Sequence, residues 1–320
     1  NEFRPPIQDL DNLPIPDLNL IENLDIDNYR SVHAHNKRVI YISGSRGCPF
    51  SCTFCAAHLV HGREVRFRNP KKIVDEIEYN QKKYSIGYVG FKDGTFTLNH
   101  QWVKELCSEI INRKIKIGFA VNARVDTINE DILKILREAG CQTIGFGLES
   151  GSQRILDIMR KGTSLKQITE AIGLVRKYDF FSVGSYMVGN PGDTRESINE
   201  TYKLARDLKT TAVAFSPLTA FPGTQIYFDA LKNGSLKNPK WYFKKDPNNK
   251  DEFLPINNYD GVLTFSEFST EKELNKVYHK YYFRIPYIFS MIKRVIKEPY
   301  LLKYAIGYTW GIIKKTFVDT

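Results

Sequence analysis

Cys48, Cys52 and Cys55 lie within eight residues, at the spacing C-x3-C-x2-C. Cysteine thiolates are the usual ligands of iron–sulfur clusters, and a [4Fe-4S] cube is ordinarily held by four of them. Three thiolates bind three irons and leave the fourth iron open to another ligand. The spacing therefore predicts a cluster whose chemistry takes place at its open iron, and the rest of the chain must position it.

A structural zinc site is the alternative for the same cysteines. His58 and His61 follow them closely, so that Cys48, Cys52, Cys55 and His58 make a set of three thiolates and one imidazole. Tetrahedral zinc accepts such a set. The spacing alone leaves both interpretations open, because a motif is a hypothesis until its structural context is known.

Residues 45–55 resemble the signature of the radical S-adenosylmethionine (radical SAM) superfamily, including the aromatic Phe54 directly before the third cysteine. The resemblance implies that the three cysteines hold a [4Fe-4S] cluster whose open iron chelates the amino and carboxylate groups of S-adenosylmethionine (SAM). An electron from the cluster then cleaves the sulfonium and releases a 5'-deoxyadenosyl radical. The cofactors supply this chemistry and the protein supplies their site, with Phe54 beside it. A reductant such as flavodoxin or ferredoxin is implied as a partner.

The composition indicates a globular chain: 320 residues, 42% hydrophobic and 26% charged, suffice for one large core or two modest ones. Five cysteines, three of them clustered, do not resemble a secreted disulfide framework and need a reducing compartment, which predicts a cytoplasmic location. We interpret Cys107 and Cys141 as small buried hydrophobes. No apolar run reaches the roughly 18 to 20 residues that cross a bilayer, and no signal segment opens the chain. A soluble or peripheral protein is predicted.

Residues 1–38 are proline-rich and acidic without a sustained hydrophobic period, which predicts an extended linker. Residues 5–17 resemble the connector between an N-terminal cobalamin-binding domain and the barrel in one large subgroup of the superfamily. The sequence begins at Asn1 rather than at a methionine, and the resemblance implies a cobalamin-binding domain that these residues do not contain. A surface strap that only packs on the core is the alternative.

From Val39 to about Pro217, short apolar segments alternate with amphipathic ones. Strands are predicted at 39–43, 86–92, 116–121, 142–147, 181–188 and 211–216, and helices near 70–83, 99–113, 128–139, 152–178 and 194–208. Helix starts are marked by Asn69 before Pro70 and by the pairs Thr127/Glu130, Ser164/Gln167 and Asp193/Glu196. Strict alternation predicts an α/β fold with parallel strands. The resemblance implies a partial (β/α)6 TIM-like barrel over residues 39–225.

Parallel α/β barrels bind ligands at the carboxyl ends of their strands, and the cysteine segment follows the first predicted strand directly. This position favours the cluster over a zinc site. After the second strand, Asp93-Gly94 stands where the subgroup has two consecutive acidic residues, one of them usually near the methionine amino group. The resemblance assigns that role to Asp93, and a simple Asp-Gly turn is the alternative.

The next two strand ends also carry polar groups. Asn122 and Arg124 follow the third strand, and the guanidinium of Arg124 suits the methionine carboxylate or a substrate acid. An ion pair with Asp126 is the alternative. The fourth strand ends in a segment resembling the family's nucleoside-binding glycines and acidic residue, which implies a cofactor role for Gly147 and Glu149. A solvated carboxylate is the alternative for Glu149.

Two further groups follow. Arg154, Arg160 and Lys161 are either counter-charges to a ligand carboxylate or, on the predicted helix, a solvated face. Pro222-Gly223-Thr224 resembles the segment that closes over the adenine, so Pro222 and Gly223 are predicted to line the cofactor site.

The region 226–320 is predicted to be a mostly helical extension after a long Asn-, Lys- and Pro-rich loop at 232–262. From residue 270 onward, ten basic residues stand against four acids among eleven aromatic residues, which predicts two or three amphipathic helices broken near Pro286 and Pro299. We expect them to pack on the barrel and cover the substrate opening. Contact with an anionic membrane surface is the second interpretation, and RNA binding is the least favoured.

These features predict a radical SAM enzyme. The linker and the segments 46–49 and 66–70 resemble the cobalamin-dependent subgroup, which implies methyl transfer to, or rearrangement of, an unactivated carbon in a substrate that the sequence does not name. A cobalamin-free radical SAM enzyme and a zinc-stabilised RNA-binding module are the alternatives. A tRNA methylthiotransferase is disfavoured because only Cys107 and Cys141 remain for the second three-cysteine site of those enzymes.

Overall fold

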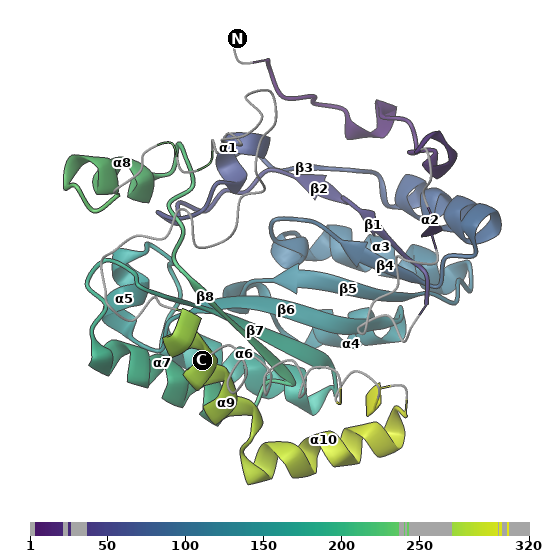
Figure 1. The fold of residues 1–320 in the computed structure, drawn as a ribbon. Helices are drawn as coiled ribbons and strands as arrows, with labels where there is room; N and C mark the ends of the chain where they lie inside the picture. Colours follow the sequence, from purple (N-terminus) through teal and green to yellow (C-terminus); the bar gives the residue numbers. More distant parts are fainter. Residues whose placement is uncertain are drawn as a thin grey trace.

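The computed structural model describes residues 4–21, 25–26, 37–236, 240, 242, 271–299, 301–302 and 306. Their centre is a six-stranded parallel sheet in the order β1-β4-β5-β6-β7-β8, with every strand next to its predecessor in the chain (Figure 1). The strands are β1 (Val39–Ile42), β4 (Tyr88–Phe91), β5 (Gly118–Ala123), β6 (Cys141–Glu149), β7 (Phe181–Val188) and β8 (Ala212–Pro217). The predicted parallel α/β fold is confirmed.

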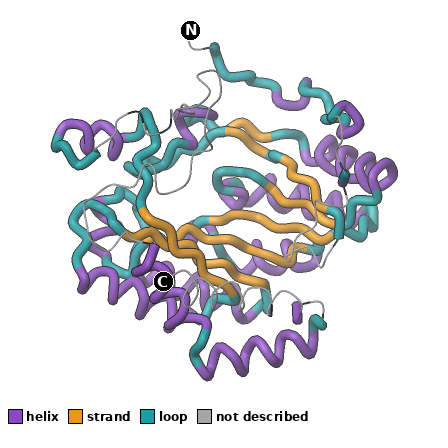
Figure 2. The backbone as a smooth tube through the Cα atoms, viewed as in Figure 1, coloured by secondary structure: helices purple, strands orange, loops and turns teal. Residues whose placement is uncertain are grey.

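One face of the sheet carries the core. The crossover helices are α2 (Pro70–Tyr84), α3 (His100–Asn112), α4 (Glu130–Glu138), α5 (Gln153–Ile158), α6 (Leu165–Lys177) and α7 (Arg195–Leu208), and Figure 2 shows them beside the fanned strands. Alternate strand residues such as Val89, Phe119 and Ile144 are fully buried against them. Because successive residues of a strand point to opposite faces, the remaining residues face away from the helices and are left to form the site.

The predicted helix 152–178 is wrong in one respect that matters for the site. It is two helices, α5 and α6, separated by a turn in which Arg160 and Gly162 have φ of 51° and 70°. Ser164 begins α6 with the predicted capping box to Gln167. Lys161 therefore lies on a connection between helices and not on a helical face.

The other helix starts follow the same local rules with small shifts. Asn69 caps α2 ahead of Pro70, as predicted. The predicted starts at Thr127 and Asp193 are wrong, because Asn129 caps α4 and Thr194 caps α7 with a box to Ser197. In each case the capping residue has a side-chain oxygen that accepts a hydrogen bond from a backbone N–H of the first helical turn.

The cysteine segment is held by a small element outside the sheet. β2 (Ser45–Arg46) pairs antiparallel with β3 (Arg66–Phe67), and the short helix α1 (Ala57–His61) lies between them in the chain. Gly47 has φ of 112°, and a Cβ there would lie 2.0 Å from the carbonyl oxygen of Glu64. Only glycine allows the two sides of this ribbon to approach so closely.

The N-terminal residues lie against this ribbon and α2. Residues 4–21 are extended apart from two single-turn 3-10 helices, η1 (Leu10–Asn12) and η2 (Leu18–Leu20). The Asp11 carboxylate accepts from the Asn69 backbone N–H at 2.9 Å, and Asp17 accepts from the Tyr84 hydroxyl at 2.5 Å. This agrees with the extended segment predicted for residues 1–38, of which 1–3, 22–24 and 27–36 lie outside the described residues.

The C-terminal helices α9 (Glu271–Tyr282) and α10 (Ile285–Lys297) are broken near Pro286, as predicted. The Tyr282 hydroxyl donates to the Val213 carbonyl at 2.9 Å and accepts from its N–H at 3.0 Å, and Tyr278 does the same at Phe215. Four helical residues rise about 6 Å and two strand residues about 6.6 Å, so the two tyrosines match the free edge of β8. They take the place of a further strand.

The expectation that this extension covers the substrate opening is not met by its described residues. None of those in α9 or α10 lines the cavity described below. The predicted loop 232–262 lies almost wholly outside the described residues. Within the part of the chain that the structure describes, no helix is long and apolar enough to cross a membrane.

Candidate active site

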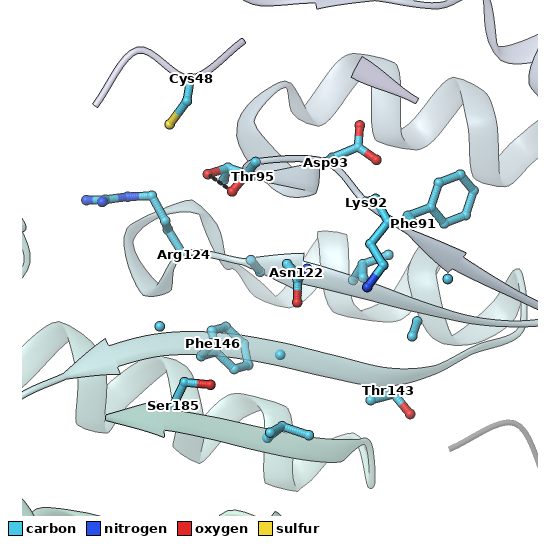
Figure 3. A pocket seen from close by; sticks show the side chains of 18 of the residues that line it. Cys48, Phe91, Lys92, Asp93, Thr95, Asn122, Arg124, Thr143, Phe146 and Ser185 are labelled. Atoms are coloured by element: carbon cyan, nitrogen blue, oxygen red, sulfur yellow. Dashed lines mark hydrogen bonds between the residues drawn. The ribbon is translucent and has the colours of Figure 1, made fainter. Parts of the chain in front are cut away.

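A cavity of about 460 Å³ lies on the face of the sheet that the helices leave uncovered. This volume is within the range of small-molecule sites. Its lining includes all three clustered cysteines and residues at the carboxyl ends of β4, β5 and β6. Figure 3 shows Cys48 and Arg124 at one side of the cavity and Lys92 at the other, with Asn122 between them.

The cysteine loop is fixed by backbone hydrogen bonds to three distant segments. The N–H of Cys48 donates to the Gly62 carbonyl, and the N–H of Thr53 donates to the Met159 carbonyl, at 3.1 and 3.0 Å. The Thr53 carbonyl in turn accepts from the N–H of Ile226, at the start of α8 (Gln225–Lys232). The loop is thus tied to the connection between α5 and α6 and to the segment after β8.

Asp93 anchors the entry to the cysteine loop. Its carboxylate accepts from the Ser45 hydroxyl at 2.5 Å and from the Gly44 N–H at 3.2 Å. Burial raises the pKa of Asp93 to about 6, although these hydrogen bonds oppose the shift. Both carboxylate oxygens are therefore engaged by the protein, and Asp93 lines the cavity as a support of the loop.

Gly94 stands where the subgroup has its second acidic residue, and the structure explains this departure. A Cβ at Gly94 would lie 3.3 Å from the Gly47 carbonyl oxygen and 3.5 Å from the Cys48 Cβ. The cysteine loop passes directly over this position. A Cβ here would require the Gly47 carbonyl to shift by a few tenths of an ångström.

Arg124 is buried and committed to several partners. Its Nε and Nη2 donate to the two carboxylate oxygens of Asp126 at 2.9 and 2.8 Å, and Nη2 also donates to the Lys161 carbonyl. The guanidinium lies 3.6 Å from the centre of the Phe50 ring, and Nη1 is 4.0 Å from the Cys52 sulfur. The predicted ion pair with Asp126 is present, and the remaining nitrogen faces a cysteine of the motif.

Glu149 and Lys161 form a buried ion pair at the end of β6. The Lys161 ammonium donates to a Glu149 oxygen at 2.8 Å, and each side chain is 9% exposed. Glu149 has φ of 63°, a conformation that costs energy outside glycine and that clusters at functional sites. A Cβ at Gly147 would lie 2.3 Å from the Glu149 oxygen, so this glycine leaves the space that the pair occupies.

Burial raises the pKa of the Cys52 thiol, and the charges of Lys161 and Arg124 partly offset the rise. A thiolate is the form that binds metal. The two cations that face Cys52 therefore favour the ligand form of a cysteine that its burial disfavours. Arg124 and Lys161 therefore act on Cys52 as well as on their own carboxylate partners.

The donor set fits an iron–sulfur cluster better than a zinc ion. Cys48, Cys52 and Cys55 all line the cavity, whereas His58 and His61 do not. The described residues contain no group of three His, Cys, Asp or Glu side chains placed to hold one metal ion. A cube binds each thiolate through a separate iron, so its ligands need only surround a common space. The cavity provides that space, and Gly94 places no side chain beside Cys48.

The structure brings most of the predicted residues together. Phe54, Asp93, Asn122, Arg124, Gly147 and Glu149 line the same cavity as the cysteines. Pro222 and Gly223 do not. Gly223 packs on Leu59 of α1, where a Cβ would lie 2.9 Å from the leucine, so this segment supports the cysteine loop from outside the cavity.

Two charged residues of the lining, Lys161 and Lys92, are not among the residues that the sequence assigns to the cofactor site, although Lys161 is one of three candidates for the counter-charge to a ligand carboxylate. Lys161 was placed on a helix, although Gly162 and the capping box at Ser164 were signals for a break before α6. Lys92 precedes Asp93 and faces the cavity. Nothing in the sequence distinguishes it from a surface lysine.

Comparison with known proteins identifies the family. The family model described as the radical SAM superfamily matches residues 42–205, just over half of the chain. This chain belongs to the radical SAM superfamily. The family implies a [4Fe-4S] cluster and SAM, and its match runs from the last residue of β1 through the cysteine motif to most of α7.

Curated relatives of this radical SAM chain are longer than it is. It is 32% identical to an uncharacterized methyltransferase of Pyrococcus horikoshii over 88% of this chain and 58% of the relative. It is 29% identical to the anaerobic magnesium-protoporphyrin IX monomethyl ester cyclase of Rubrivivax gelatinosus over 98% of this chain and 57% of the cyclase. The chain thus spans somewhat more than half the length of these relatives.

Solved structures share the fold of the radical SAM chain. The methyltransferase TsrM of Kitasatospora setae, solved with cobalamin and a [4Fe-4S] cluster, matches 62% of this chain and 38% of its own length with a TM-score of 0.58 and 21% identity. Methylornithine synthase matches 75% of this chain and 61% of its own length with a TM-score of 0.51 and 14% identity. At these identities the likeness concerns the fold alone.

Proposed function

We propose that this chain is the radical SAM module of an enzyme that cleaves SAM reductively and uses the resulting radical for cobalamin-linked methyl transfer to, or rearrangement of, an unactivated carbon. The observation that carries the proposal is the convergence of Cys48, Cys52 and Cys55 with the Glu149–Lys161 pair on one cavity at the strand ends. A bound [4Fe-4S] cluster would supply the electron that breaks the sulfonium bond.

The chain's own residues bind and orient in this proposal. The three thiolates hold the cluster, while Arg124 and Lys161 place positive charge beside Cys52. Glu149 would accept hydrogen bonds from the amino or ribose groups of SAM, and its contact with Lys161 fixes the direction of the carboxylate. Asp93 holds the start of the loop through hydrogen bonds to both of its carboxylate oxygens. To contact the methionine amino group as predicted, one of these oxygens would have to accept a second hydrogen bond.

The cobalamin-linked step has separate support. One relative bears the name of a methyltransferase, and the TsrM structure contains cobalamin. The described N-terminal residues run from β3, where the Ile7 carbonyl accepts from Arg66, along α2 to Tyr84 at its end, and an extended segment of this kind suits a connector. A flavodoxin or ferredoxin is the proposed source of the electron.

The first experiment reconstitutes the protein without oxygen and counts metal. About four irons and four sulfides per chain are expected, together with 5'-deoxyadenosine when dithionite and SAM are added. Cys52→Ala should abolish both, whereas Cys107→Ala, which removes a buried thiol of α3 outside the cavity, should retain both. One zinc per chain with no cluster would refute the proposal in favour of a zinc-stabilised module.

The second experiment addresses cobalamin alone. The protein as its gene encodes it is expressed with hydroxocobalamin and examined by absorbance after gel filtration. Retention of about one cobalamin per chain supports the cobalamin-linked step. Cleavage of SAM without cobalamin retention would instead assign the chain to cobalamin-free radical SAM enzymes.

A further inference from the structure

Of the three cationic side chains that line the cavity, two are paired with carboxylates. Arg124 is paired with Asp126, and Lys161 is paired with Glu149. Lys92 also lines the cavity and is exposed to it, but the contact it makes among the described residues is with an aromatic ring. One side of the cavity therefore carries a positive charge available to a ligand.

The lysine is directed into the cavity by its neighbours. Tyr41 of β1 pairs with Gly90 of β4, and a Cβ at Gly90 would lie 2.5 Å from two carbons of the Tyr41 ring. The ring therefore lies across the glycine. Lys92, two residues beyond Gly90 and on the same face, places its ammonium 4.3 Å from the ring centre. This cation–π contact orients the ammonium without neutralising it.

An amide lies on the neighbouring strand. Asn122 of β5 lines the cavity and is exposed to it. Its strand partner is Gly145, where a Cβ would lie 2.6 Å from the Asn122 oxygen, so the glycine leaves room for the amide. Figure 3 shows Lys92 and Asn122 on the same side of the sheet, both directed into the cavity. An ammonium and an amide N–H are the donors that a carboxylate or phosphate oxygen accepts from.

We propose that Lys92 and Asn122 bind an oxyanion of the substrate, a carboxylate or a phosphate. The proposal rests on the proposed function, because it orients a substrate between this side of the cavity and the cysteine side. A lysine ammonium is a point charge that recognises either oxyanion. The enzyme would accordingly act on an acidic small molecule.

The test follows the lysine itself in the cluster-loaded protein. Lysines are dimethylated with ¹³C-formaldehyde, and the Lys92 signal is assigned by its absence in Lys92→Gln. Inorganic phosphate and glutarate are titrated separately, each against sodium chloride at equal ionic strength. A saturable shift of the Lys92 signal is expected with at least one of them, and the stronger of the two identifies the class. The Lys166 side chain, 83% exposed on α6, supplies the control signal.

Two variants separate a built site from a surface charge. Asn122→Ala should weaken the binding of the anion about tenfold or more, which is the loss expected for one hydrogen bond to a charged group. Gly90→Ala should also weaken it, because the methyl group displaces the Tyr41 ring that orients Lys92. A Lys92 shift no larger than that of Lys166, or equal shifts in all three proteins, would overturn the proposal. Iron content and SAM cleavage of the same samples report separately on the proposed function.

A different observation carries a second proposal. Five large apolar side chains of α10 are between 42% and 74% exposed: Ile285, Ile288, Phe289, Ile292 and Ile296. Their spacing puts them on one face of the helix. The opposite face is attached to the sheet edge, where the Tyr287 hydroxyl donates to the Thr211 carbonyl and Arg294 donates to the Thr211 hydroxyl. The apolar stripe is therefore held outward.

We infer that the α10 stripe lies in the interface of an anionic membrane. Lys293 and Lys297 are exposed along one edge of the stripe, and the chain carries a net charge of +10. Apolar side chains on one face with lysines beside them are the features of helices that bind anionic lipid in the plane of the surface. Charge complementarity thus favours lipid over a second copy of this basic chain.

Sedimentation with vesicles tests this surface. The protein should bind vesicles of phosphatidylcholine and phosphatidylglycerol at 3:1 and bind pure phosphatidylcholine much less. Phe289→Ser with Ile292→Gln should reduce binding about tenfold or more, as expected when roughly two buried side chains are lost. Val60→Gln, which changes an exposed residue of α1, should leave binding unchanged. Equal binding by the double variant, or a dimer that this variant abolishes, would refute the inference.

Discussion

At the cysteine side of the cavity Arg124 and Lys161 each have a carboxylate partner, whereas at the Tyr41 side Lys92 rests on an aromatic ring. The Glu149–Lys161 pair is buried, and each side chain needs the other, because a buried charge without a partner is strongly destabilising. Lys92 is exposed and forms no ion pair among the described residues. The contrast suggests that the first side organises the cofactors and the second recognises the substrate. Four predictions separate the two roles.

The largest effect is expected for Lys161→Met, which leaves the buried Glu149 carboxylate without a counter-charge. The variant should lose about 3–5 kcal/mol of unfolding free energy, measured by urea denaturation. Lys166→Met, at an exposed site, should change it by less than about 0.5 kcal/mol. Adding Glu149→Gln to Lys161→Met should recover part of the loss. A loss below about 1 kcal/mol would show that the pair is dispensable.

The pH dependence of stability should reveal Asp93. Its pKa is raised to about 6 in the folded chain from 3.8, so between these values the folded state binds more protons than the unfolded state. Stability therefore falls as pH rises from about 4 to 6, by about 3 kcal/mol for this shift. Asp93→Asn should remove this slope and Asp131→Asn, at an exposed site on α4, should keep it. The same slope in Asp93→Asn and wild type would contradict the assignment.

Two glycine substitutions should have opposite signs. Gly147→Ala puts a methyl group 2.3 Å from the Glu149 oxygen and should cost about 1–3 kcal/mol, with weaker SAM binding. Gly173→Ala lies in α6 with nothing within 4 Å and should be neutral or stabilising by up to about 1 kcal/mol. Thermal unfolding of both measures the difference. A neutral Gly147→Ala would mean that the ion pair can move aside.

The smallest effect on stability is expected at Lys92. Lys92→Met should change the free energy of unfolding by less than about 0.5 kcal/mol, because the ammonium is exposed and has no acidic partner among the described residues. Urea denaturation of this variant beside Lys161→Met tests the comparison directly. A loss above about 2 kcal/mol would make Lys92 part of the scaffold rather than of substrate recognition.

Local sequence patterns predicted much of this fold. The alternation of apolar and amphipathic segments located all six strands of the parallel sheet within a few residues, and Asn69, Pro70 and Ser164 marked helix starts correctly. These signals act between neighbours in the chain, so they can be read without the rest of the molecule. The errors at Thr127 and Asp193 arose because a second residue able to cap the helix follows within two positions, Asn129 for α4 and Thr194 for α7.

Contacts between distant segments could not be predicted from these local patterns. The connection after α5 is also held by a distant residue, because the Thr53 N–H donates to the Met159 carbonyl from a loop 106 residues earlier. Pro222 and Gly223 were predicted to line the cavity, but neither belongs to its lining, and Gly223 lies against Leu59 of α1. The Tyr278 and Tyr282 hydroxyls form hydrogen bonds with the edge of β8, more than 60 residues earlier in the chain.

The sequence by itself determined the cysteine spacing, the parallel α/β alternation and hence the end of the sheet at which ligands gather, because these depend on residue type and periodicity alone. Only the tertiary structure decided which charges are paired. Arg124 pairs with Asp126, and Lys92 lies over the Tyr41 ring. Lys161 lies on the connection between α5 and α6, where it pairs with Glu149. A side chain's partner is set by which segments fold against each other, and that information is not present in any one of them.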